Sequence, residues 1–311
     1  MNRTAKEYSL ITLKGIAMGA ADVIPGVSGG TIAFITGIYE ELINSIKSVN
    51  LSAIKLLFTG KFNEFWNAVN GTFLLSLFTG IAISIISLAK GLKYLLDHYP
   101  ILVWSFFFGL VVASSIYVAR TIPKWKLGTV ASGIAGIIIA YFITIITPAE
   151  ANTTYWFIFL SGAIAICAMI LPGISGSFIL VLLGMYKFIL EAVGNFEIAV
   201  IITFLAGAAI GIISFSNLLS WLLKKYHNIT IALLSGFMIG SLNKVWPWKE
   251  VVETFTDRHG EIKPLIEENI LPATYEQITG NHAFLGGATA LAVLGFVLIF
   301  VVENIANRLK K

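Results

Sequence analysis

The sequence predicts an all-α polytopic membrane protein, built as an inverted repeat with two re-entrant helical hairpins and about six transmembrane helices. Composition is the first reason, because 57% of the 311 residues are hydrophobic and only 12% are charged, more apolar surface than a soluble core buries. The second reason is a motif, Pro-Gly-Val-Ser-Gly-Gly at 25–30, that returns as Pro-Gly-Ile-Ser-Gly-Ser at 172–177 in another apolar stretch. A straight helix does not continue through this motif, since proline lacks an amide donor and glycine is a poor helix former.

The two motifs belong to halves of the chain that align with one another. The alignment that superimposes the motifs also places Gly15 on Gly162 and Tyr39 on Tyr186. A second alignment, offset by an insertion in the first half, places Gly80, Tyr99 and Gly109 on Gly207, Tyr226 and Gly236. The chain is therefore expected to be an internal duplication, with a first repeat over 1–150 and a second over 151–311.

Each repeat is expected to contain its broken segment followed by three spans. In the first repeat the broken segment covers 9–46, and the spans cover about 71–90, 101–119 and 127–147. The insertion at 47–69 mixes Leu, Phe and Trp with lysines, which predicts an amphipathic helix on the membrane surface.

In the second repeat the broken segment covers 155–193, and the spans cover about 198–222, 229–245 and 283–303. The stretch 246–282 is polar and rich in Glu, so it is expected outside the membrane on the outer face. A plain loop is the simplest form for it, and a cap over an outer vestibule is the alternative.

Charge decides how the broken segments run. If each one enters and leaves on the same face, one face of the membrane receives about two thirds of the 21 Lys and Arg residues, as the positive-inside tendency demands. If each crossed once, this asymmetry would vanish. Both termini are therefore expected to be cytoplasmic. An odd number of crossings per repeat makes the repeats inverted, so the two re-entrant tips meet near the membrane midplane.

The tips have the chemistry of an anion site. Behind each break a new helix begins, where unpaired amides and the positive end of the helix dipole favour a phosphate or carboxylate. Pro25 and Pro172 break the helices, and the alternative reading is that both breaks are only packing kinks. The residues predicted to bind the anion through amides or hydroxyls are Gly26, Ser28, Gly29, Gly30, Thr31, Gly173, Ser175, Gly176 and Ser177.

The first motif, extended to Gly19–Ala33 (GAADVIPGVSGGTIA), together with Leu171–Ser177 and the Gly240-Ser241-Leu242 and Trp246-Pro247-Trp248 runs, resembles the bacterial PopT family. The resemblance covers essentially the whole chain. It implies a membrane transporter, not an enzyme, that moves undecaprenyl phosphate from the outer to the cytoplasmic leaflet of the inner membrane and so recycles the lipid carrier of cell-wall synthesis. Its partners would be this lipid and the surrounding bilayer.

Three charged residues are candidates for a role in transport. Arg120, at the end of a span, is the first choice for a cation that holds the phosphate head, and Lys244 is the second. Both also fit ordinary interfacial snorkelling. Asp22, three residues before Pro25, is the one acid expected deep in the membrane, and it is either a proton or sodium site or an acceptor for the broken backbone.

Two other functions remain open from the sequence. A secondary transporter of a small soluble anion would share the architecture but enclose a sealed cavity, whereas a lipid substrate requires a lateral opening. An intramembrane serine protease is suggested by Gly-x-Ser-Gly, yet no histidine lies deep in a predicted span to act as base. One cysteine and four dispersed histidines predict no metal site. No cofactor and no nucleic-acid partner are expected, and the oligomeric state is left open.

Overall fold

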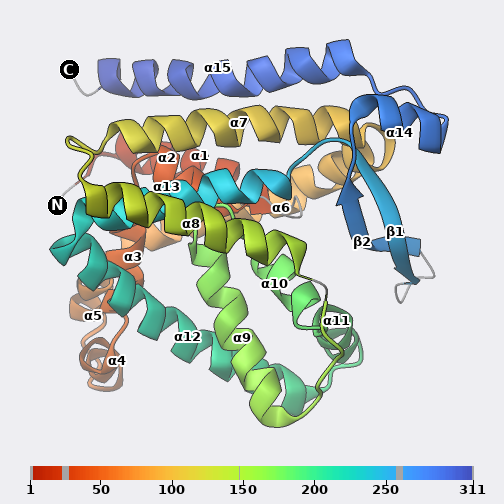
Figure 1. Cartoon of the computed structure of the whole chain (residues 1–311). Coiled ribbons are helices and arrows are strands. Elements are labelled where there is room, and N and C mark those ends of the chain that lie inside the picture. Colours follow the sequence, from red (N-terminus) through yellow and green to blue (C-terminus); the bar gives the residue numbers. More distant parts are fainter. Residues whose placement is uncertain (1–2, 23–27, 147, 257–261, 310–311) are drawn as a thin grey trace.

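The computed structural model describes residues 3–22, 28–146, 148–256 and 262–309. It is a mostly helical body with one two-stranded sheet at one end (Figure 1). The first half contains α1 (Ala5–Asp22), α2 (Gly29–Ile35), α3 (Tyr39–Ser48), α4 (Leu51–Phe58), α5 (Phe62–Ala68), α6 (Gly71–His98), α7 (Pro100–Arg120) and α8 (Leu127–Ile145). The second half contains α9 (Tyr155–Ile170), α10 (Gly176–Leu182), α11 (Tyr186–Gly194), α12 (Ile198–Lys225), α13 (His227–Gly240), the short 3₁₀ helix η1 (Ser241–Asn243), β1 (Lys249–Thr256), β2 (Ile262–Asn269), α14 (Pro272–Thr279) and α15 (Leu285–Leu309).

Helix pairs with matching places in the two halves hold the body together. The first broken segment packs through α1 on α6, and the second packs through α9 on α12. The next pairs cross between the halves, since α7 packs on α15 and α8 packs on α13. Glycines allow these close crossings: a Cβ at Gly80 would clash with the Thr12 carbonyl, and one at the aligned Gly207 would clash with the Phe159 carbonyl.

Several helices are long and apolar enough to cross a bilayer, which confirms a multi-pass helical membrane protein. Among the described residues these are the apolar part of α6 (Gly71–Leu88), α7, α8 and α12. α9 and the Leu285–Val301 part of α15 are shorter apolar helices. α13 has 14 residues, about 21 Å of helix at 1.5 Å per residue. The span predicted at 229–245 is therefore wrong at its end: the α-helix stops at Gly240 and the chain continues through η1.

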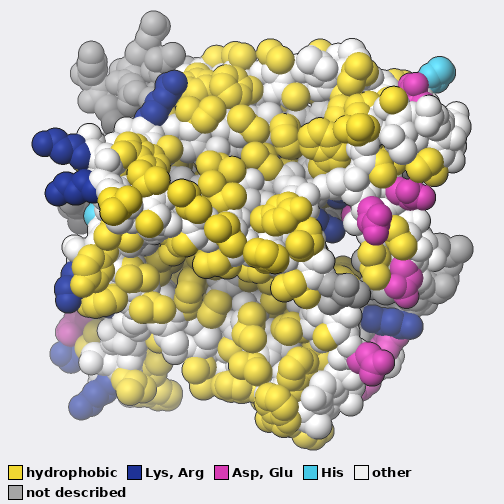
Figure 2. Space-filling view, in the orientation of Figure 1, with side chains coloured by type: hydrophobic (Ala, Val, Ile, Leu, Met, Phe, Trp, Pro, Cys, Tyr) yellow, Lys and Arg dark blue, Asp and Glu magenta, His cyan; other side chains and the backbone are white. Residues whose placement is uncertain are grey.

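The outer surface agrees with this membrane assignment. Hydrophobic side chains cover the middle of the face seen in Figure 2, over the helices of the body. Lys and Arg gather at the end where both chain termini lie, and Asp and Glu gather at the opposite end, around the β-hairpin (Figure 2). The surface therefore has an apolar belt between a basic end and an acidic end.

Two predicted segments differ from the structure. Residues 47–69 do not form one amphipathic helix, because the chain turns at Gly60, whose φ of +73° ends α4 before α5 begins. The stretch 246–282 is not a plain loop either. It holds the antiparallel β1–β2 hairpin, with Lys249 opposite Asn269, followed by α14. The acidic composition that indicated exposure did not exclude a hairpin.

The second broken segment is bent as well as interrupted. α10 and α11 lie at 110° to each other across the short turn that contains Gly184. α11 lies toward the end of the molecule that carries the hairpin, whereas α3, its counterpart in the first half, lies toward the other end (Figure 1).

Candidate functional site

The two broken segments contact each other through hydrogen bonds between residues more than 130 positions apart. Ser28 Oγ lies 3.1 Å from the Met169 carbonyl oxygen and 3.3 Å from that of Leu171. The Tyr39 hydroxyl donates to the Ile170 carbonyl at 3.2 Å. These carbonyls need outside partners because α9 ends there, and the last carbonyls of a helix have no intrahelical donor. Side chains of the first segment therefore complete the end of the second segment's helix.

One further hydrogen bond joins the segments, with its donor on the second segment. The Gly173 amide donates to Thr31 Oγ1 at 2.9 Å. Gly173 has a φ of +89°, a left-handed conformation that glycine adopts without strain. A Cβ there would also clash with the Ser241 hydroxyl of η1. Pro172 and Gly173 thus make a tight turn that fits between α2 and η1.

At the first tip, the amides of Gly29 and Gly30 have partners within the protein. Ser28 caps α2, since its Oγ accepts from the Gly30 amide at 3.1 Å. The Gly29 amide donates to the Asp22 carboxylate at 2.6 Å. Asp22 therefore accepts from the backbone beyond the break, which is one of the two roles predicted for it. Pro25 and Gly26 lie outside the described residues.

At the second tip, Ser175 caps α10 by accepting from the Phe178 amide at 3.3 Å, and its hydroxyl lies 2.7 Å from that of Ser177. Accessibility differs between the tips. Ser28 and Thr31 are buried, with at most 1% of their surface exposed, whereas Ser177 is exposed and Gly176 is partly exposed. A ligand can therefore approach the Ser177 hydroxyl of the second tip, whereas the Ser28 and Thr31 hydroxyls of the first segment are not accessible in this conformation.

The two candidate cations lie in different places. Arg120 is exposed at the end of α7, and its guanidinium lies 5.5 Å from the Phe300 ring centroid on α15. That ring contact is with α15 and not with a broken segment. Lys244, directly after η1, lies closer to the second tip, because its ammonium is 4.7 Å from the ring centroid of Phe178, the residue after Ser177.

Sequence reasoning missed two charged residues beside Lys244. Its ammonium lies 3.4 Å from the Glu267 carboxylate, and Lys249 Nζ lies 3.2 Å from the same oxygen. Lys249 is also 4.3 Å from the Trp104 ring centroid and is almost completely buried. The sequence carried no clear signal for them, because β1 (KEVVETFT) and β2 (IKPLIEEN) lack the strict alternation of apolar and polar residues that marks a half-buried strand.

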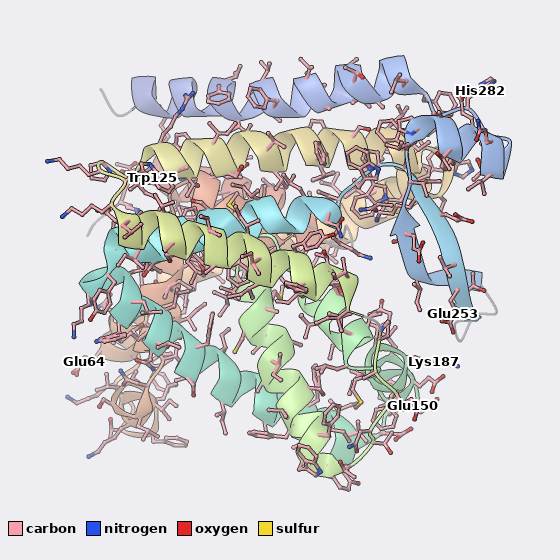
Figure 3. The ribbon with its side chains drawn as sticks, viewed as in Figure 1. Glu64, Trp125, Glu150, Lys187, Glu253 and His282 are labelled. Atoms are coloured by element: carbon pink, nitrogen blue, oxygen red, sulfur yellow. The ribbon has the colours of Figure 1, made fainter. Side chains whose placement is uncertain are left out.

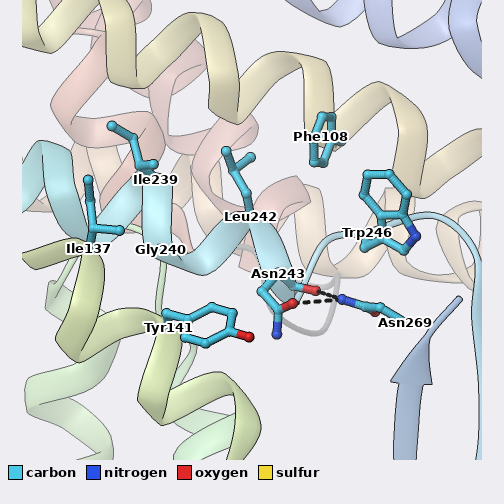
Figure 4. A pocket seen from close by; sticks show the side chains of 9 residues that line it. All are labelled: Phe108, Ile137, Tyr141, Ile239, Gly240, Leu242, Asn243, Trp246 and Asn269. Atoms are coloured by element: carbon cyan, nitrogen blue, oxygen red, sulfur yellow. Dashed lines mark hydrogen bonds between the residues drawn. The ribbon is translucent and has the colours of Figure 1, made fainter. Parts of the chain in front are cut away.

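A pocket of about 380 Å³ lies next to η1, between α7, α8, α13 and the base of the hairpin (Figure 4). Its body is mainly apolar, and its polar end is closed by the Asn269 amide, which donates to both oxygens of Asn243. Tyr141, Ile239 and Asn269 are exposed, so the pocket reaches the molecular surface. The lining residues are Phe108, Ile137, Tyr141, Ile239, Gly240, Leu242, Asn243, Trp246 and Asn269.

The serine contacts do not resemble those of a hydrolase. A serine nucleophile needs a base that accepts its proton. Ser28 instead lies against backbone carbonyls, and Ser175 lies against Ser177. Within the described part of the chain, these hydroxyls act as caps and as contacts between segments.

Comparisons with known proteins agree on one family. The model of a family described as VCA0040-like, undecaprenyl phosphate translocase-like, matches residues 18–263. The chain is 47% identical over 301 residues to a polyprenyl-phosphate transporter of Vibrio cholerae, and this alignment covers 97% of this chain and 98% of that protein. It is 34% identical over 254 residues to a polyprenyl-phosphate transporter of Staphylococcus aureus, covering 76% of this chain and 85% of that protein. No solved structure matches the chain significantly.

Proposed function

Because the chain belongs to the VCA0040-like family of undecaprenyl phosphate translocase-like proteins, we propose that it carries undecaprenyl phosphate from the outer to the cytoplasmic leaflet of the bacterial inner membrane and so recycles the carrier lipid. It acts as a transporter, not as an enzyme. The observation that carries the proposal is the contact between two broken segments inside an apolar helical body, through Ser28, Thr31 and Tyr39. Broken helices with polar backbone at membrane depth are typical of substrate sites in transporters.

The proposed architecture is an inverted repeat with two re-entrant hairpins and cytoplasmic termini. Three observations support it: the matched packing of α1 on α6 and α9 on α12, the opposite positions of α3 and α11, and the basic end beside both termini (Figures 1 and 2). Lys and Arg concentrate on the cytoplasmic side of membrane proteins. The end that carries the β-hairpin is then the outer end.

Physical chemistry explains why this lipid needs a protein. A phosphate head carries one to two negative charges, and an isolated ion in hydrocarbon costs on the order of tens of kcal/mol by an idealised Born estimate. The protein has to shelter only the head, because the isoprenoid tail can stay in the bilayer. Amides and hydroxyls at the tips, with a cation nearby, can replace the water lost by the head. A pocket that reaches the surface beside η1 fits a lipid better than a sealed small-anion cavity would.

We assign coupling to Asp22 as part of this proposal. Moving one negative charge inward against 100 mV costs roughly 2.3 kcal/mol. Asp22 lies at the first tip, where its carboxylate caps the Gly29 amide. Protonation or sodium binding would neutralise this carboxylate and weaken its hydrogen bond to the Gly29 amide, so that the phosphate can compete for the amide. Arg120, exposed on the basic end, is the proposed cytoplasmic cation that receives the head.

The test is flipping of undecaprenyl phosphate in proteoliposomes of purified protein, read by accessibility of the head to an external phosphatase. Gly30→Ala should reduce flipping, because a Cβ at Gly30 would clash with the Ile170 carbonyl. Gly128→Ala is the matched control, since a Cβ at Gly128 meets nothing within 4 Å. No flipping by the wild-type protein, with or without an ion gradient, would contradict the proposal and favour a small-anion carrier.

A further inference from the structure

Two lysines and one glutamate form a small charged cluster between the helical body and the β-hairpin. Lys244 Nζ and Lys249 Nζ lie 3.4 and 3.2 Å from the same carboxylate oxygen of Glu267. The side chains of Lys244 and Glu267 are each 22% exposed, and that of Lys249 is 8% exposed. The cluster is therefore largely shielded from water, with an opening at Lys244.

The hairpin brings these residues together by its register. Lys249 lies opposite Asn269, and Glu267 lies two residues from Asn269 on the same strand. Residues two apart on a strand point to the same face, so Lys249, Glu267 and Asn269 share one face of the hairpin. Asn269 binds Asn243, the residue before Lys244. The same face thus completes the polar end of the pocket and the charged cluster.

Among the described residues, the cluster holds two positive charges and one negative charge. Two ammonium groups face one carboxylate, and the other faces of the lysines are covered by the Phe178 and Trp104 rings, which carry no charge. Burial lowers the pKa of Lys249 to about 8, because removal from water disfavours the charged ammonium. The attraction of Glu267 opposes this shift, and the repulsion of Lys244 adds to it. The pKa of Glu267 is lowered, since the attraction of the two lysines outweighs its own burial. A second anion would balance the charges.

A ligand can reach the cluster from the solvent side. Figure 2 shows Lys or Arg atoms at the bottom of a hollow between the helical body and the hairpin. On the protein side, Lys244 covers Phe178, which follows the exposed Ser177 of the second tip. The neighbouring pocket offers apolar walls beyond Asn243.

We propose that Lys244 and Lys249 form a binding site for a phosphomonoester group at the hairpin end of the second broken segment, with Glu267 as the resident counter-ion of the unliganded protein. Two ammonium groups that converge on one oxygen can equally converge on a phosphate oxygen, as charge-assisted bonds. That the phosphate belongs to a polyprenyl lipid rests on the proposed function. The site would then receive the head at the outer end, before it passes to the Ser175–Ser177 turn.

The opposing interpretation is that the cluster is only a strut that fastens the hairpin. The two interpretations predict opposite effects of removing the Glu267 carboxylate on phosphate affinity. If the cluster only fastens the hairpin, removal of the carboxylate and removal of a lysine disturb the hairpin equally, and any loss of affinity is the same for both. A phosphate site loses affinity without a lysine and gains affinity without the competing carboxylate.

The test is a binding titration on the purified full chain in nanodiscs, by calorimetry, with farnesyl phosphate as the probe. Lys244→Gln should weaken binding about tenfold or more, as expected for loss of one charge-assisted bond, and Lys244→Arg should restore most of it. Glu267→Gln should bind farnesyl phosphate at least as tightly as the wild type. Lys187→Gln is the matched control, because Lys187 forms an exposed pair with Glu191 and lies toward the same end of the molecule as Glu253 (Figure 3).

Unchanged affinity in Lys244→Gln would overturn the proposal, as would equal losses in Lys244→Gln and Glu267→Gln. Farnesol should not bind detectably at this site, because it lacks the phosphate. Inorganic phosphate is titrated in a separate experiment. If it binds as tightly as farnesyl phosphate does, with the same dependence on Lys244, the site exists and its ligand is free phosphate, not a lipid head. If the wild type binds farnesyl phosphate but does not flip undecaprenyl phosphate, the proposed function is wrong and the binding site stands. If the wild type flips the lipid but Lys244→Gln binds farnesyl phosphate as tightly as the wild type does, the binding site is wrong and the proposed function stands.

Discussion

Ser28→Ala and Ser175→Ala test the contact between the broken segments. The two serines occupy matching places in the two motifs, but the structure gives Ser28 more hydrogen-bond partners than Ser175, so the two should contribute differently to the free energy of unfolding. Ser28 is 1% exposed, caps α2 and lies within hydrogen-bond distance of two carbonyls of the other segment. Ser175 is 8% exposed, caps α10 and otherwise contacts the neighbouring Ser177. A lost cap costs about 1 kcal/mol. Leaving a buried carbonyl without its donor costs a further ~1–3 kcal/mol.

We therefore expect Ser28→Ala to lower the free energy of unfolding by roughly 2–4 kcal/mol and Ser175→Ala by about 1 kcal/mol. The assay is equilibrium unfolding of the purified protein in mixed micelles, followed by far-UV circular dichroism as the denaturing detergent is increased. Ser87→Ala is the control, because Ser87 is exposed and bonds only within its own helix. Equal losses for Ser28 and Ser175, or a loss at Ser28 no larger than at Ser87, would refute the reasoning.

Three further predictions concern coupling, charge and backbone. Asp22→Asn keeps an acceptor for the Gly29 amide but cannot gain or lose a proton, so flipping in proteoliposomes should lose its dependence on a proton or sodium gradient; retained dependence would exclude Asp22 as the coupling site. Lys249 has a folded-state pKa of about 8 against 10.5 when unfolded, so the unfolded chain binds more protons between these values and stability should rise with pH across that window, by up to about 3 kcal/mol. Lys249→Met should flatten this rise in unfolding titrations, and an identical pH profile would contradict it. Gly173→Ala should cost at least ~1 kcal/mol, because of its positive φ and the clash with Ser241, whereas Gly128→Ala should be nearly neutral in the same unfolding assay.

The parts of the fold that the sequence predicted are those with local causes. Pro172-Gly173 ends α9 because neither residue continues a helix, and the long apolar runs of α6 and α12 identify themselves by length. Gly60 was a local signal of the same kind, and it divides the predicted amphipathic helix into α4 and α5. The β-hairpin was missed because its strands are acidic and do not alternate apolar and polar residues strictly. Its contact with the helical body, such as that of Lys249 on β1 with the Trp104 ring, is a tertiary one.

The candidate site divides in the same way. The motif residues Ser28, Thr31 and Gly173 lie close together. The repetition of the motif had predicted that the tips of the two broken segments meet. The hydrogen bond from the Gly29 amide to Asp22 was open between two roles, because sequence does not say which acceptor is nearest. Lys249 and Glu267 meet Lys244 only through tertiary packing, so no spacing along the chain indicates their cluster.

On the proposed transport path, the phosphate head passes through the junction of the two broken segments. The most direct measurement is photo-crosslinking in proteoliposomes with a polyprenyl phosphate whose photoreactive group is beside the phosphate, followed by mapping of the labelled peptides. Labelling is expected at 28–31, 173–178 and 241–244, and unlabelled undecaprenyl phosphate should compete with it. Labelling confined to the outer surfaces of α8 and α12, with none at these three segments, would contradict it.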